Sequence, residues 1–156
     1  MHMHFSKQAA KHLREVFFGG NWTSVNVRDT LQAVTWEHSI RTVYSLNSIS
    51  KLTYHIGYYV TAILKVMKGG PLDAHDKFSF DLPPLQDEED WQKLVHKTLT
   101  EAEELIQLIE RLPEDKLADF FVEEKYGTYY RNFHGLVEHT HYHLGQISLL
   151  KKILLQ

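Results

Sequence analysis

Histidine is the residue type in this chain whose number and spacing could support chemistry. Eleven of the 156 residues are histidines, and four of them fall between His134 and His143. Residues four apart share one face of a helix and residues two apart lie on opposite faces, so His139 and His143 form a pair from which His141 points away. His55 lies in an earlier stretch with apolar residues at helical spacing, so we expect a third imidazole to face the core.

These three histidines allow two interpretations. In the first, each imidazole is a core group that is hydrogen-bonded to a neighbouring residue. In the second, three neutral imidazoles converge, and because they have few ways to satisfy one another, a metal ion lies between them. Three nitrogen ligands that leave one position open for water are typical of catalytic zinc. The spacing therefore makes His55, His139 and His143 candidate ligands of a divalent metal ion.

Composition and the remaining motifs argue against several other function classes. The chain has no cysteine, which excludes disulfides, thiolate metal sites and a cysteine nucleophile. The formal net charge is −3 and the sequence has no basic tract, so it lacks the positive charge typical of proteins that bind nucleic acid. An H-E-x-x-H motif, a glycine-rich phosphate loop and a serine nucleophile motif are all absent from the sequence. No apolar run approaches the ~20 residues that cross a bilayer, so we expect no membrane partner and a cytoplasmic location.

Four segments with apolar residues at helical spacing are expected to position the candidate ligands. They span residues 5–18, 47–68, 87–112 and 129–155. Good capping residues precede three of them, namely Asn47 or Ser48, Asp87 and Thr128. Two shorter helical turns are expected, at residues 27–34 and 113–121.

The connection between the second and third long helices determines the topology. Its 17 residues, 69–85, span about 55 Å when extended, whereas the preceding helix is about 30 Å long. This connection is therefore long enough to cross the bundle and to start the next helix in parallel. The sequence predicts a single domain over residues 1–156, an all-α four-helix bundle with up-down-down-up order and a long crossover between helices 2 and 3.

Two motifs resemble those of the DinB-like family, which includes the YfiT-like thiol transferases. One is the segment NSISKLTYHIGYY from Asn47 to Tyr59, and the other is EHTHYHLGQ from Glu138 to Gln146, which ends in His-x-x-x-His-x-Gly-Gln. The order of the shorter matches NWT, TWE, LPP and LP also agrees, so the resemblance covers nearly the whole chain. One departure is Leu144, where many relatives have a basic residue.

The resemblance implies the same up-down-down-up bundle and a divalent metal ion, commonly zinc or nickel. The family's three histidine ligands correspond to His55, His139 and His143. Relatives often pair, so the resemblance, together with apolar and aromatic residues expected on one face of the bundle, leads us to expect a homodimer.

The leading hypothesis is a metal-dependent transferase that moves a low-molecular-weight thiol onto an electrophilic small molecule. A divalent ion with an open position can present a thiolate at neutral pH, and the sulfur must come from a cosubstrate because the chain has no cysteine. Tyr59 is a candidate pocket wall or donor, and Gln146 is a candidate support for His143. Arg131 and Asn132 are candidates to bind a substrate carboxylate, although the sequence favours a surface role for both at the start of the last helix. Two alternatives remain open: metal-assisted hydrolysis by a bound water, and a dimeric metal-binding module without turnover.

Overall fold

The computed structural model describes residues 4–155, and within this range the chain consists of helices and loops without a strand. Residues 1–3 and 156, which the single-domain prediction includes, lie outside the described range. The four long helices are α1 (Phe5–Phe18), α4 (Ile49–Met67), α5 (Glu88–Glu110) and α6 (Tyr129–Leu154). The shorter elements are α2 (Val27–Gln32), α3 (Trp36–Ile40) and the 3₁₀ turns η1 (Asp76–Phe78), η2 (Glu114–Ala118) and η3 (Glu124–Tyr126). The all-α prediction is confirmed.

The predicted long helices agree with the observed ones to within two residues at each end, because their capping residues stand where the helices start. Ser48, Asp87 and Thr128 each accept a hydrogen bond from the backbone N–H three residues later. The short helix α3 is not predicted by the sequence analysis. Among the described residues, no helix is long and apolar enough to cross a bilayer.

The four long helices pack around one core. Helix α5 contacts both α1 and α4, and α6 contacts the same two helices from the other side. The side of α5 with residues at helical spacing faces inward, since these residues are buried; they are Trp91, Thr98, Ala102, Leu105 and Ile109. Burial of such stripes removes apolar surface from water, which is the main favourable contribution to the free energy of folding.

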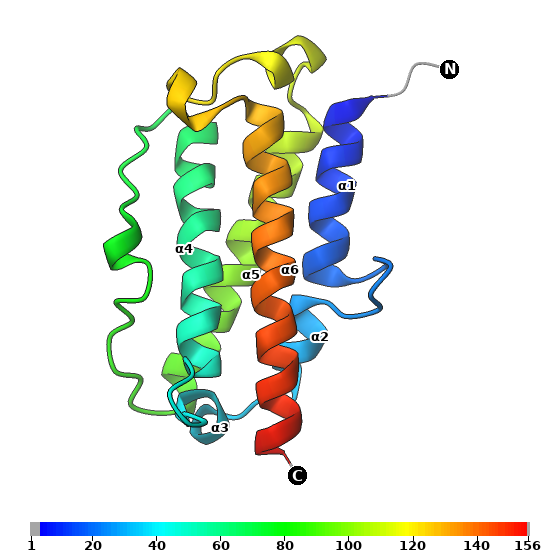
Figure 1. Cartoon of the computed structure of the whole chain (residues 1–156). Coiled ribbons are helices and arrows are strands. Elements are labelled where there is room, and N and C mark those ends of the chain that lie inside the picture. Colours follow the sequence, from blue (N-terminus) through cyan, green and yellow to red (C-terminus); the bar gives the residue numbers. More distant parts are fainter. Residues whose placement is uncertain (1–3, 156) are drawn as a thin grey trace.

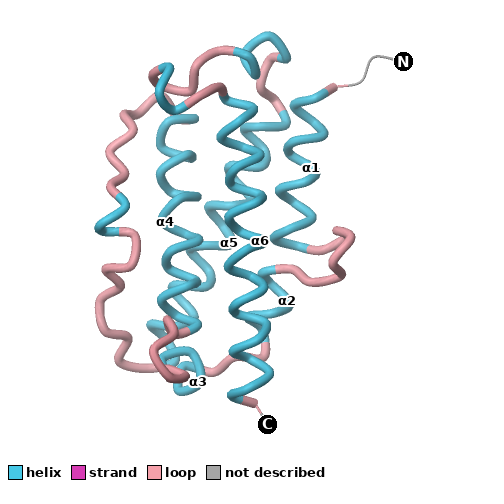
Figure 2. Tube along the Cα trace, viewed as in Figure 1, coloured by secondary structure: helices cyan, strands magenta, loops and turns pink. Residues whose placement is uncertain are grey.

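The connection between α4 and α5 lies against the outside of the bundle. In Figure 1, α4 and α5 both begin at the end of the bundle where α3 lies, and the chain between them returns along α4. Figure 2 shows this connection as loop with a single helical turn, η1. We call residues 69–86 the crossover segment. Because it runs beside α4, its side chains and carbonyl groups can reach the residues of that helix.

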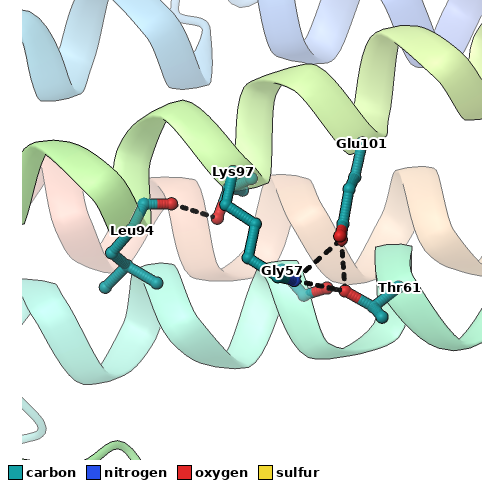
Figure 3. A network of polar contacts seen from close by, with 6 residues as sticks. Gly57, Thr61, Leu94, Lys97 and Glu101 are labelled. Atoms are coloured by element: carbon teal, nitrogen blue, oxygen red, sulfur yellow. Dashed lines mark hydrogen bonds and ion pairs between the residues drawn. The ribbon is translucent and has the colours of Figure 1, made fainter.

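A close approach of α4 to α5 fixes how α4 is oriented. A Cβ atom at Gly57 would lie 2.7 Å from the Thr98 hydroxyl oxygen of α5, so the two helices meet where α4 has no side chain. Figure 3 shows the polar contacts beside this point: Lys97 donates to the hydroxyl of Thr61 at 3.0 Å and to the carboxylate of Glu101 at 2.9 Å. Gly57 follows His55 by two residues, so contact of this side of α4 with α5 turns His55 away from α5.

Replacing Gly57 with Ala is expected to destabilise the protein by about 1–3 kcal/mol, because the added methyl group overlaps the Thr98 hydroxyl. The free energy of unfolding from urea denaturation measures the change. The matched control is Gly145→Ala in α6, where a Cβ has no neighbour within 4 Å and where the change should stabilise the helix by about 0.5–1 kcal/mol. Removing the hydroxyl in Gly57→Ala/Thr98→Ala should recover part of the loss. Equal effects at the two glycines would contradict the close approach.

Candidate metal centre

Three imidazole rings from two helices meet between α4 and α6. The ring centroids of His55 and His139 are 4.8 Å apart, and His143 lies 4.6 Å from each of them. One ring nitrogen from each histidine lies within 4.8 Å of the others, which is close enough for the three to hold one metal ion. His55 and His143 are only 6% and 7% exposed, and His139 is half-buried. The structure thus brings the three candidate ligands together.

Hydrogen bonds from outside the cluster determine which ring nitrogens carry protons. The Nδ1 of His55 is 3.3 Å from the backbone carbonyl of Ser79, and the Nδ1 of His143 is 2.7 Å from the side-chain oxygen of Gln146. Both oxygens can only accept, so each Nδ1 donates a proton and each Nε2 keeps a free lone pair. Metal-binding histidines generally have this arrangement, in which an outer acceptor fixes the tautomer. Gln146, a candidate support for His143 in the sequence, makes this contact.

His139 differs from the other two histidines because its outer nitrogen has no partner among residues 4–155. Its Nε2 lies 2.9 Å from the Nε2 of His55, and since that nitrogen has a lone pair, His139 donates the proton between them. The Nδ1 of His139 is buried and makes no hydrogen bond to the described residues. A buried ring nitrogen without a partner is costly, and the three convergent nitrogens share a single proton between His55 and His139. A divalent ion that accepts imidazole nitrogens, such as zinc or nickel, fits this donor set.

Burial keeps two of the imidazoles in the neutral form that a metal ion requires. Burial is the main cause that lowers the pKa of His139 to about 4, and positive charge on His143 and His55 would add to the effect. Burial also lowers the pKa of His55, and again a charge on His143 acts in the same direction. Both rings are therefore neutral near pH 7, with lone pairs available to a cation.

The crossover segment supplies one wall of the site, a contribution that the sequence analysis did not predict. The ring of Phe80 stacks on that of His55, with centroids 3.8 Å apart and planes 9° from parallel. Ser79 holds His55 through its carbonyl, and its hydroxyl donates to the carbonyl of Asp76 at 2.7 Å. No sequence signal identified the contact of this segment with His55.

Tyr59 connects the histidines to a carboxylate on the crossover segment. Its ring contacts the edges of His55 and His139, with centroids 5.2 and 4.8 Å apart, and its hydroxyl donates to the Asp76 carboxylate. Burial, followed by this bond, raises the pKa of Tyr59 to about 12, so the phenol stays protonated. The negative charge of Asp76 raises the pKa of His55 and of His139, which offsets part of the effect of burial. A cation bound by the three neutral rings would therefore have a carboxylate nearby.

A cavity of about 620 Å³ opens beside His139, between α4, the start of α6 and η3. Its volume lies in the range of small-molecule sites. Three further candidate site residues line it, namely Tyr59, Arg131 and Asn132. The side-chain amide of Asn132 donates to the carbonyls of Tyr126 and Thr128, so it braces the start of α6. Arg131 lies 3.4 Å from the Glu138 carboxylate, and its side chain is 63% exposed.

The other histidines of the C-terminal cluster lie outside the site. His141 is half-buried and does not belong to the group of ring nitrogens that lie close together. His134 stacks on Tyr130 and lies 3.4 Å from Glu138 on the surface of α6. The four-residue spacing thus distinguishes His139 and His143 from their neighbours.

Comparisons with protein-family models, curated proteins and solved structures give no match for this chain. Membership of the DinB-like family therefore stays a prediction that rests on the two sequence motifs.

Metal binding should depend on His143 and not on His141. The His143→Ala variant is expected to lose zinc or nickel affinity at least about 100-fold, because it removes one of three nitrogen ligands. The His141→Ala variant, two residues away on the same helix, should bind as the unchanged protein does. Metal content after purification without an affinity tag, followed by titration with a competing chelator, provides both values. Similar affinities in the two variants would contradict the three-histidine site.

The metal-free protein should lose stability as the pH falls below neutral. An unfolded His139 takes up a proton near pH 6.5, whereas the folded one does so only near pH 4. Between these values the unfolded state binds more protons, so stability declines as the pH falls from about 6.5 towards 4. Thermal unfolding midpoints of chelator-treated protein at about pH 7.5 and pH 5 test this effect.

The His139→Gln variant separates this contribution from that of other acid-sensitive groups. It removes the titrating ring, so its unfolding midpoint should fall less between the two pH values than that of the unchanged protein. An equal decline in both proteins would show that His139 is protonated in the folded state at its ordinary pKa.

Proposed function

We propose that this protein is a divalent-metal-dependent transferase of the DinB type, which moves a low-molecular-weight thiol onto an electrophilic small molecule. The observation that carries the proposal is the convergence of His55, His139 and His143 beside a cavity of about 620 Å³. Three protein ligands leave a coordination position for a substrate, which is the pattern of a catalytic rather than a structural metal site.

The up-down-down-up order of the DinB-like bundle is part of this proposal. It is supported by the direction of the helices in Figure 1, where α4 and α5 begin at the same end and α6 runs the opposite way. The contacts of both α5 and α6 with α1 and α4 also support this helix order. This order places His55 on α4 next to the histidines of α6.

A divalent ion held by the three histidines would lower the pKa of a thiol bound at the open position and so supply a thiolate at neutral pH. The chain's own residues orient the reactants and receive the proton. Ser79 and Gln146 hold the rings of His55 and His143 with their Nε2 atoms toward the centre. Phe80 covers the face of the His55 ring, which keeps water from that side of the site.

Asp76 is the proposed acceptor of the thiol proton. Its carboxylate is hydrogen-bonded to the hydroxyl of Tyr59, which lines the cavity beside His139. In the reaction the S–H bond breaks and its proton passes to this carboxylate, with Tyr59 as a relay. The sulfur forms a bond to the electrophilic carbon, and the leaving group departs with the electron pair of its own bond.

A homodimer belongs to the same proposal. Apolar side chains that are exposed along the C-terminal half of α6 and directly after it support it; they are Tyr142, Leu149, Ile153 and Leu155. Three exposed apolar residues on one helix, followed directly by Leu155, are more than isolated surface hydrophobics, and such patches are typical of association surfaces.

The proposal predicts consumption of an electrophile that requires both metal and thiol. Zinc- or nickel-loaded protein is incubated with 1-chloro-2,4-dinitrobenzene and a small thiol, and the thioether product is measured by absorbance. The loaded protein should accelerate product formation well above chelator-treated protein. The His143→Ala variant should resemble the chelator-treated sample, and His141→Ala should resemble the loaded protein.

The same assay distinguishes the alternatives. Loss of the electrophile without thiol, with release of the hydrolysed product, would indicate metal-assisted hydrolysis and contradict thiol transfer. Metal binding without any acceleration, across a panel of thiols and electrophiles, would indicate a binding module without turnover.

A further inference from the structure

One face of α6 carries two of the candidate metal ligands and also an arginine. Arg131, Gly135, His139 and His143 are spaced at intervals of four residues. Residues at this interval lie nearly above one another on a helix, one turn or about 6 Å apart. Arg131, Gly135 and His139 also line the same cavity. The periodicity of α6 thus extends the site from the histidines to Arg131.

Gly135 lets the guanidinium group of Arg131 lie against the helix. A Cβ atom at Gly135 would come within 2.9 Å of the Nη1 of Arg131, so the group occupies the space that a side chain would take. At the other end of the same side chain, Gly127, which has a φ of +73°, would place a Cβ 3.3 Å from the Cγ of Arg131. The two glycines therefore form a cradle that directs Arg131 along α6 towards His139. Since Gly135 precedes His139 by one turn, the guanidinium group lies about 6 Å along the helix from a metal ligand.

Arg131 offers a planar group with several donors to this cavity. Its contact to Glu138 is long, at 3.4 Å, and involves one of the five N–H groups of a guanidinium. Two other polar residues of the lining are held more closely: the Nζ of Lys125 lies 3.1 Å from Glu123 and over the ring of Tyr126, and Asn132 donates to backbone carbonyls. A guanidinium fork with free donors matches the geometry of a carboxylate, which it binds through two parallel hydrogen bonds.

We infer that the thiol cosubstrate carries a carboxylate a short chain away from its sulfur, and that Arg131 binds this carboxylate. The inference rests on the proposed thiol transfer and specifies its substrate class. With the sulfur at the open metal position, a chain of two or three carbon atoms allows the carboxylate to reach a group one helical turn from His139. Arg131 is then a specificity-determining residue that selects acidic thiols over neutral ones.

The test compares two thiols that differ only in charge. Cobalt-loaded protein is titrated with 3-mercaptopropionate and with its neutral amide, 3-mercaptopropionamide, and binding is followed through the visible absorption of cobalt, without turnover. The unchanged protein should bind the acid on the order of tenfold more tightly than the amide. Arg131→Gln should remove this preference while leaving cobalt affinity and amide binding unchanged. Arg131→Lys, which keeps the charge but not the fork, should retain a smaller preference.

Lys125→Gln is the matched control, because it removes another positive charge from the lining of the same cavity. This variant should keep the full preference, since Lys125 is engaged by Glu123. Equal affinities for the two thiols in the unchanged protein, or a preference that survives Arg131→Gln, would overturn the inference and leave thiol transfer intact. If cobalt binds but neither thiol changes its spectrum, the proposed thiol transfer fails, and the role of Arg131 fails with it.

Discussion

Three imidazole rings share one small space between α4 and α6, and only one proton can lie between any two of them. Ser79 and Gln146 fix the protons of His55 and His143 on the outer nitrogens, so their inner nitrogens have lone pairs. His139 then donates its proton inward and leaves its own outer nitrogen buried and unpaired. A cation at the centre would take the place of the proton between His55 and His139, and each ring would then offer it one nitrogen.

The crossover segment has a chemical role in addition to its topological one. It connects α4 to α5 over the length of the bundle, and on its way it places Asp76, Ser79 and Phe80 against the residues of α4. A shorter connection between antiparallel helices would leave His55 without its backbone acceptor and the site without a nearby negative charge. The connection between α4 and α5 therefore also determines the hydrogen bonding and the charge around the histidines.

Two glycines influence the geometry of the site because each allows another group to approach its helix closely. Gly57 lets α4 approach α5, which sets the rotation of α4 and with it the direction of His55. Gly135 lets Arg131 lie close to the α6 backbone, one turn from His139. In both cases a missing side chain allows a polar group to come within 3 Å of the Cβ position, so the geometry of the site depends on residues that contribute no functional group themselves.

The sequence alone determined the long helices, their caps and the pairing of His139 with His143, because capping and periodicity are local properties of a helix. It also identified His55 as inward-facing and Tyr59, Arg131 and Asn132 as candidates near the site. It did not identify Asp76, Ser79 or Phe80, and it did not show that His139 lacks an outer partner in the part of the chain that the structure describes. Those features depend on how the crossover segment docks on α4 and how α6 rotates against it. Contacts between elements distant in sequence carry no periodic signal, so only the tertiary structure decided which carbonyl or carboxylate lies at each ring.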